Sequence, residues 1–295
     1  MSPTRRPGLG VAAMVAATLL WGATFVVIRD SVRDIPPLAL VAARFGIAAV
    51  VYAAVIAIRR RPPDRDAWLG GIAGAPFALA CYELQALGLT TTSAGSSAFL
   101  TAAGTLSVAF VAWPLLGQRP SPRVVTGILI ALAGSALLSW RAGLGFGRGE
   151  ALTLIGAALW GGNILAIAAR IERADPVSLA AVQTFVMALL ALPPGAAGLS
   201  AFTRVTPAVW LRFSYLALVG SVVAPLLQIV AQRSLPVARI GLLFALEPVF
   251  ALLFAVSVGA ERFSVSWWTG AALILFAVVL VEARSSPPSS PTASP

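Results

Sequence analysis

The sequence predicts an all-α integral membrane protein whose ten transmembrane helices form two inverted repeats of five helices each. Composition is the first reason. The 295 residues are 59% hydrophobic and 11% charged, whereas soluble domains have about a quarter of their residues charged. Apolar stretches also follow one another along the chain without a polar block between them. So few charges cannot cover a water-facing surface, and we therefore expect one lipid-embedded domain.

Ten apolar stretches approach the ~20 residues that a helix needs to cross a bilayer. The first is interpreted as a retained span and not as a signal peptide, because its apolar run is long and no small-residue cleavage site precedes a polar region. Residues 285–295 are of low complexity and are predicted to form a disordered tail. The predicted spans are Leu9–Ile28, Pro37–Ile58, Ala67–Gly88, Ser93–Leu116, Val124–Trp140, Ala151–Ile171, Val177–Ala197, Trp210–Gln232, Ile240–Val258 and Ser266–Val281.

The basic residues set the expected orientation. All 21 are arginines, and the net charge is +10. They gather at the ends of the spans and not along one polar face, which favours lipid headgroups over nucleic acid as the partner. With the N-terminus inside, more arginines fall on the cytoplasmic side than on the other. The positive-inside rule therefore predicts a multi-pass protein of the inner (plasma) membrane with both termini in the cytoplasm.

The residue types that are missing exclude several kinds of site. Histidine is absent, and the single cysteine, Cys81, lies within an apolar stretch, which excludes disulfides and Cys/His metal sites. Without lysine there is no P-loop for ATP. No aspartate falls inside a predicted span, so an intramembrane enzyme with paired aspartates is not expected either. We expect no enzyme activity, no metal and no bound cofactor; the expected partners are the lipid bilayer and a small molecule, with monomer and homodimer both open.

The chain also divides into two similar halves, residues 1–143 and 149–284. Leu20-Trp21-Gly22 in the first span has a counterpart in Leu159-Trp160-Gly161 in the sixth, and residues 117–121 align with residues 260–264 without a gap. Five spans is an odd number, so the second half must have the opposite orientation to the first. Inverted repeats of this kind place a binding site at the midplane and permit alternating access.

Several short motifs follow one another along the chain in a characteristic order. They are Trp21-Gly22-x-x-Phe25, Ala43-Arg44-Phe45, residues 86–94 (ALGLTTTSA) with 98–101 (AFLT), Glu247-Pro248-Val249-Phe250 and Gly259-Ala260-Glu261-Arg262. From Leu9 to Glu282 the chain thereby resembles the ten-helix EamA-type permeases of the drug/metabolite transporter superfamily. The resemblance implies secondary transport of metabolites, often efflux of amino acids or related compounds, without ATP hydrolysis. Thr105 and Gln118 depart from the proline and glutamate that the family often has there.

Three ionisable residues, Arg44, Glu83 and Glu247, fall within predicted spans. Such residues cost several kcal/mol unless they face protein or water. Arg44 and Glu83 lie at similar depth on consecutive antiparallel helices, which predicts an ion pair between them. Two interpretations remain open: the pair pins the two helices together, or Arg44 holds an anionic group of a substrate for which Glu83 competes.

Glu247 and Pro248 lie near the middle of the ninth span. A buried carboxyl suits a proton-coupling site. Proline has no N–H for the carbonyl of Phe244, so a helix kink is expected at Pro248. The alternative is a packing kink with a glutamate bonded to its neighbours. In the repeat alignment the counterpart is Gly104-Thr105, which has neither acid nor proline, so the defect is expected in the second half alone.

A set of aromatic and amide residues completes the candidate substrate site. Such side chains can line a cavity with stacking faces and amide hydrogen bonds, although they more often hold helices together. The sequence favours a secondary active exporter of small metabolites, with Glu247 as the candidate proton-coupling residue. A lipid flippase or scramblase is the alternative, because similar polar residues could line its path. The candidate substrate-binding residues are Trp21, Phe25, Arg44, Tyr82, Glu83, Trp160, Asn163 and Gln228.

Overall fold

The computed structural model describes residues 7–139, 147–259 and 265–283, and every regular element within them is a helix. Eight helical segments are long and apolar enough to cross a membrane, and two shorter apolar helices complete the set. The prediction of an all-α fold with ten spans is thereby confirmed. The predicted tail, the boundary at residue 143 and the repeat segment 260–264 lie outside the described residues.

The first five spans use six helices, because the fourth span is broken. The helices are α1 (Pro7–Ser31), α2 (Pro37–Arg59), α3 (Arg65–Gly88), α4 (Ala94–Leu106), α5 (Val108–Leu116) and α6 (Pro122–Ser139). Local sequence explains where several of them begin. Asp64 caps α3 by accepting a hydrogen bond from the N–H of Ala67 (2.7 Å), and Ser93 caps α4 in the same way.

The last five spans include two composite ones. A 3₁₀ helix, η1, prolongs the seventh span, and a π-helical segment, η2, lies in the middle of the eighth. The ninth is broken like the fourth. The elements are α7 (Arg148–Ala168), α8 (Pro176–Gly195), η1 (Ala196–Arg204), α9 (Pro207–Ser214), η2 (Tyr215–Val223), α10 (Ala224–Ser234), α11 (Val237–Phe244), α12 (Glu247–Ser257) and α13 (Val265–Glu282).

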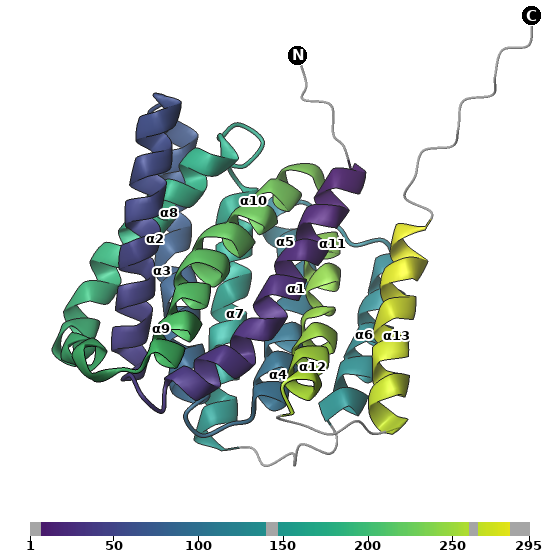
Figure 1. Ribbon diagram of the computed structural model, residues 1–295. Helices are drawn as coiled ribbons and strands as arrows, with labels where there is room; N and C mark the ends of the chain where they lie inside the picture. Colours follow the sequence, from purple (N-terminus) through teal and green to yellow (C-terminus); the bar gives the residue numbers. More distant parts are fainter. Residues whose placement is uncertain (1–6, 140–146, 260–264, 284–295) are drawn as a thin grey trace, which may run out of the picture.

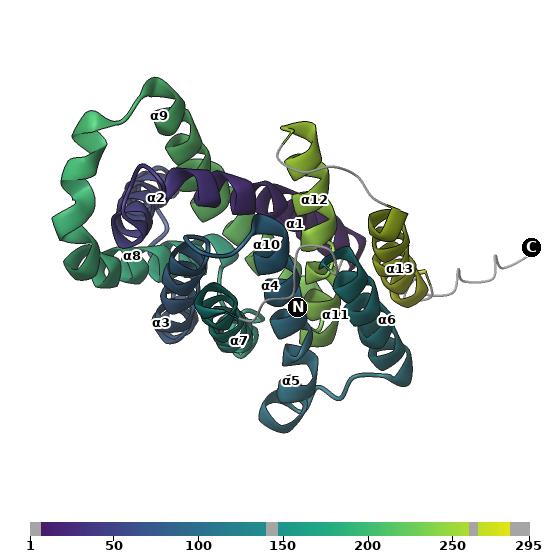
Figure 2. The same ribbon diagram turned by 90° about the horizontal axis from the view of Figure 1, so that it is seen from below.

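The two halves interlock, and their contacts come in matched pairs. Exchange of the halves maps the first span onto the sixth, the second onto the seventh, and so on. Packing of α1 on α10 is matched by α7 on α3, packing of α1 on the ninth span by α7 on the fourth, and η2 on α2 by α3 on α8. The pairs α2–α8 and α6–α13 map onto themselves and lie towards opposite edges of the bundle (Figure 2). This pattern indicates a pseudo-two-fold axis through the middle of the bundle.

The spans alternate in direction, so α1 begins and α13 ends at the same side of the bundle, whereas α7 begins at the opposite side (Figure 1). We call the side where α1 begins the N-terminal side. The second half therefore runs in the opposite sense to the first, as an inverted repeat requires. Residues from both halves meet at the centre of the bundle.

The fourth span breaks at Ser107, which corrects the expectation that only the second half has such a defect. No proline is present there. Instead, the hydroxyl of Ser107 donates to the carbonyl of Gly104 (2.6 Å), and the hydroxyl of Thr105 donates to the carbonyl of Ala102 (2.9 Å). Hydroxyl groups that bond to backbone carbonyls in this way bend helices. A Cβ on Gly104 would also overlap Ala157 of α7, so only glycine permits this approach.

The ninth span breaks beside Glu247 and Pro248, where the sequence predicts a kink. α11 ends at Phe244 and α12 begins at Glu247. Between them Ala245 and Leu246 donate to carbonyls three residues back, at 3.0 and 3.1 Å, so the chain tightens into a 3₁₀ turn. Glu247 therefore lies in the first turn of a new helix and not within a continuous one.

Candidate functional site

Five aromatic rings from both halves form the centre of the bundle. The ring centroids of Tyr82 and Trp160 are 5.4 Å apart, and those of Trp160 and Trp21 are 5.5 Å apart, both in edge-to-face geometry. Phe244 stacks on Trp21 at 5.7 Å, and Phe45 contacts Tyr82 at 4.9 Å. Trp21 and Trp160, the counterparts in the two repeats, thus contact each other directly. Edge-to-face and offset-stacked pairs are the favoured aromatic arrangements.

One small cavity, which we call the glutamate cavity, lies against Glu247. Its volume is ≈ 20 Å³. That is room for about one water molecule. Four aromatic rings contribute to its wall, with Glu247 as its one carboxylate. It is lined by Trp21, Thr24, Cys81, Tyr82, Gln85, Thr101, Trp160, Phe244 and Glu247.

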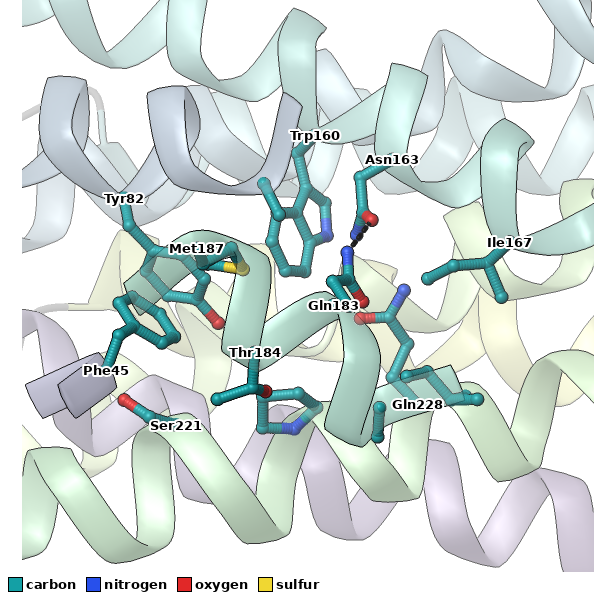
Figure 3. A pocket seen from close by; sticks show the side chains of 14 residues that line it. Phe45, Tyr82, Trp160, Asn163, Ile167, Gln183, Thr184, Met187, Ser221 and Gln228 are labelled. Atoms are coloured by element: carbon teal, nitrogen blue, oxygen red, sulfur yellow. Dashed lines mark hydrogen bonds between the residues drawn. The ribbon is translucent and has the colours of Figure 1, made fainter. Parts of the chain in front are cut away.

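A second cavity, the amide cavity, lies among α3, α7, α8 and α10 and has a volume of ≈ 10 Å³. Gln183 donates a side-chain hydrogen bond to Asn163, and Gln228 donates to Gln232 (2.9 Å). In Figure 3, Tyr82 and Phe45 lie at one end of this cavity, and Asn163, Gln183 and Gln228 lie at the other. The amide cavity therefore offers neutral donors and acceptors without a carboxylate in its lining.

The contact between Tyr82 and Trp160 separates the two cavities, because both side chains line both of them. Gln228 lies six residues before α10 ends at the N-terminal side, whereas Gln85 lies three residues before α3 ends at the opposite side. The amide cavity is thus the nearer to the N-terminal side, and the glutamate cavity is the nearer to the other. A solute that crossed the bundle between them would have to part Tyr82 from Trp160.

Four buried polar atoms near the centre have no hydrogen-bond partner among the described residues. They are the Tyr82 hydroxyl, Trp160 Nε1, Glu247 Oε2 and Arg44 Nη2. Buried polar groups are nearly always paired, and an unpaired one costs about 1–3 kcal/mol, more if it is charged. Their clustering around the two cavities, where Tyr82, Trp160 and Glu247 form part of the lining, is typical of a site that a ligand or water satisfies.

Arg44 lies beside this site but outside the lining of either cavity. Its Nε donates to the hydroxyl of Ser221 (2.7 Å), and its guanidinium lies 4.8 Å from the ring centroid of Tyr82 and 5.3 Å from that of Phe45. Only 1% of the residue is exposed. The side chain is thus held by cation–π contacts instead of a carboxylate.

The predicted ion pair between Arg44 and Glu83 is absent from the described structure, where Glu83 is only partly buried and its Oε1 has no partner. The Arg44 side chain points towards Ser221 instead of Glu83. Glu83 and Phe25 also fall outside the lining of both cavities. Of the predicted substrate site, the structure brings together Trp21, Tyr82, Trp160, Asn163 and Gln228.

The π-helical segment η2 is anchored by side chains from the first two spans. Trp21 Nε1 donates to the carbonyl of Gly220 (3.2 Å), and the hydroxyl of Tyr52 donates to the carbonyl of Val222 (2.9 Å). With the bond from Arg44 to Ser221, three side chains of the first half hold one segment of the second. π-helical turns are rare and occur frequently at functional sites.

Ion pairs also join the halves at the N-terminal side of the bundle. Arg59 at the end of α2 binds Asp175 through two hydrogen bonds of 2.7 and 3.2 Å, and Asp64 accepts a hydrogen bond from the N–H of Asp175. The Arg59 guanidinium lowers the pKa of Asp175 to about 2, and the hydrogen bonds from Ser178 act in the same direction. At the opposite side, the hydroxyl of Thr92 donates to Glu150.

Several residues that line the cavities could not be identified from the sequence. Phe244, Gln183, Thr184 and Met187 lie in apolar runs that give no sign of which face is buried. Phe244 is the most informative of them, because it is the last residue of α11, directly before the break at Glu247. Its closeness in sequence to Glu247 and Pro248 is the feature that could have identified it as a cavity residue.

Comparison with known proteins places the chain in a family. The profile of the EamA-like transporter family matches twice, at residues 8–140 and 147–283. An uncharacterised transporter of Archaeoglobus fulgidus is 30% identical over 92% of this chain and 84% of its own length. The uncharacterised inner membrane transporter YedA of Escherichia coli K12 is 27% identical over 91% and 89%.

A solved structure, described as the crystal structure of a protein, has the same fold, with a TM-score of 0.73 and 22% identity over 93% of this chain and 96% of the other. The relatives are named as transporters, and the described helices are those of a multi-pass membrane protein. The chain therefore belongs to the EamA-like transporter family and is a membrane transporter of the drug/metabolite superfamily.

Proposed function

We propose that the protein is a secondary active transporter that exports small metabolites, such as amino acids or related compounds, across the inner membrane. The observation that carries this proposal is the position of Glu247. Its buried, unpartnered carboxylate oxygen faces a cavity that residues of both repeats line, directly after a break in the ninth span. Inverted-repeat transporters place their coupling and substrate sites at such broken helices near the midplane.

Glu247 is the proposed coupling residue. Among the described residues, Glu247 and Arg44 are the two charged side chains that are fully buried, at 4% and 1% exposure. Arginine side chains stay protonated in proteins, so Arg44 cannot release a proton. Glu247 is therefore the acid that is proposed to bind and release one. With one fully buried acid among the described residues, the proposed stoichiometry is one proton per transport cycle.

The substrate would bind where the two cavities meet. Trp21, Trp160 and Phe244 offer stacking faces, and Asn163 and Gln228 offer amide hydrogen bonds. The proposed role of Arg44 as an anion anchor requires Tyr82 to swing aside, because its ring covers the guanidinium. Export is the direction that the family resemblance implies.

Both cavities are too small for a metabolite, so transport requires that the halves move apart on one side at a time. The hinges are expected at the breaks in the fourth and ninth spans and at η2, where backbone bonds are already irregular. The pair Arg59–Asp175 is expected to open when the N-terminal side opens. With both termini in the cytoplasm, as the arginine distribution predicts, that side faces the cytoplasm.

The test is flux into proteoliposomes that contain the full-length protein. Radiolabelled amino acids should enter in exchange for internal unlabelled substrate and saturate, and replacement of Trp160 by alanine should abolish the exchange. A fluorescent phosphatidylcholine should remain in its own leaflet. Movement of that lipid without solute exchange would refute the proposal and favour a scramblase.

A further inference from the structure

A larger cavity lies away from the central site, at the N-terminal side of the bundle. Its volume is ≈ 460 Å³, within the range of about 300–1,000 Å³ in which small-molecule sites fall. Its lining comes from the α5–α6 connection, the start of α11 and the end of α13, and thus from both halves. In Figure 1 the start of α11 and the end of α13 lie at the N-terminal side. It is lined by Gln118, Arg119, Pro120, Ser121, Pro122, Arg123, Val124, Pro236, Ala238, Arg239 and Val281.

The charge around this cavity is positive. Arg239 is neutralised by Glu282, with one hydrogen bond of 2.9 Å and a second, shorter one. Arg119 and Arg123 are exposed and form no ion pair with a carboxylate of the described residues. No acidic residue lines the cavity, so two arginine charges remain available to an anion.

Two helices also begin at this cavity and add to its positive field. Pro122 and Arg123 open α6, and Val237 and Ala238 open α11. The first N–H groups of a helix have no acceptor within the helix, and the dipole favours negative charge there. The side chain of Gln118 accepts from the N–H of Val237 (3.0 Å), which fixes the start of α11 against the α5–α6 connection.

The surroundings of Arg119 place the cavity at the membrane surface. Its guanidinium lies 4.8 Å from the ring centroid of Trp113. Tryptophan is enriched at the level of the lipid headgroups. α5, which ends shortly before Arg119, presents apolar side chains outward, with Phe110 45%, Trp113 48% and Leu115 65% exposed. An apolar track thus leads from the arginines into the bilayer.

We propose that this cavity binds the phosphate of an anionic phospholipid, with Arg119 and Arg123 as its ligands and with the acyl chains along α5. The lipid would join the α6–α13 pair to the start of α11, because these elements surround the cavity. The apolar track favours a lipid over free phosphate, which would gain nothing from Phe110 or Leu115. Basic pockets between membrane helices bind anionic headgroups in this manner.

The experiment uses the delipidated full-length protein in detergent, titrated with phosphatidylglycerol, with phosphatidylcholine and with inorganic phosphate, and observed by native mass spectrometry. Phosphatidylglycerol should bind more tightly than phosphatidylcholine. The double variant R119Q/R123Q should bind it about 10- to 30-fold more weakly, since two surface arginines are lost. R119K/R123K, which retains both charges, should bind within a few fold of the wild type.

The matched control is R61Q/R65Q, which removes two exposed arginines at the same side of the bundle but outside the cavity. Its phosphatidylglycerol affinity should match that of the wild type. Equal weakening in both double variants would mean that only net charge matters, and unchanged binding in R119Q/R123Q would mean that the lipid binds elsewhere; either result overturns the proposal. Inorganic phosphate that displaces the lipid at similar concentrations would overturn the lipid assignment. An unchanged melting temperature shows that the exposed substitutions leave the fold intact.

Discussion

Replacement of Glu247 by glutamine removes the proposed coupling proton while it preserves the shape of the side chain. Glu247 Oε2 has no hydrogen-bond partner among the described residues, so the amide loses no contact that the carboxylate makes there. The melting temperature of the purified variant should therefore stay within a few degrees of the wild type. Any loss of transport then reflects the missing proton and not a damaged fold.

The size of the effect follows from the number of titrating acids. One buried acid in the core couples one proton to each substrate, and one pH unit across the membrane then supplies 1.36 kcal/mol. A one-unit gradient should thus drive about tenfold accumulation of substrate by the wild type. Glu247→Gln should accumulate none, yet it should still exchange labelled for unlabelled substrate, because exchange needs no net proton movement.

The assay is uptake into proteoliposomes with and without a pH gradient, beside an exchange measurement on the same vesicles. Glu83→Gln is the matched control, since Glu83 lies within a membrane span but is only partly buried and lines neither cavity. It should retain gradient-driven accumulation. Accumulation by Glu247→Gln equal to that of the wild type would refute the coupling role.

Three further predictions concern packing, affinity and pH. Gly104→Ala should lower the melting temperature, at a cost of about 1–3 kcal/mol, because the new methyl would overlap α7, whereas Gly46→Ala, which meets nothing within 4 Å, should leave stability equal or slightly higher. Trp160→Phe should raise the KM for exchange about 2- to 10-fold, because the smaller ring weakens the proposed stacking on the substrate and an aromatic contact is worth about 0.5–1.5 kcal/mol. Asp175→Asn retains a helix cap but loses the charge whose pKa Arg59 lowers to about 2. This charge stabilises the protein above the unfolded-state pKa of about 3.9 and ceases to do so as the pH falls through about 2, so thermal melts should show a deficit of about 1 kcal/mol at pH 7 that disappears near pH 2.

The ten spans could be predicted from the sequence because bilayer thickness dictates their length and hydrophobicity. The break in the ninth span could also be predicted, since Pro248 removes a backbone donor. The break at Ser107 could not, because it depends on hydroxyl bonds to carbonyls and on the approach of Gly104 to α7. Serine and threonine occur in many unbroken helices, so their presence alone gives no signal.

Part of the central site was also predictable. Trp21 and Trp160 stand out because the repeats place them at matching positions, and they contact each other. The partner of Arg44 could not be predicted, because depth along a helix does not give the direction of a side chain. Arg44 faces Ser221 of a π-helical segment that no local sequence pattern reveals.

Alternating access around the contact between Tyr82 and Trp160 requires that the two cavities open in turn, and cysteine accessibility reports on each of them. Replacement of Cys81, the single cysteine, by serine gives a cysteine-free background. Single cysteines at Gln228 in the amide cavity and at Thr101 in the glutamate cavity then report on the two sides. Under a pH gradient with substrate, labelling at one of these two positions should rise while labelling at the other falls. Reversal of the gradient should reverse which position is labelled more. Labelling that rises or falls together at both positions would show that the two cavities do not open in turn, and would rule out alternating access around this contact.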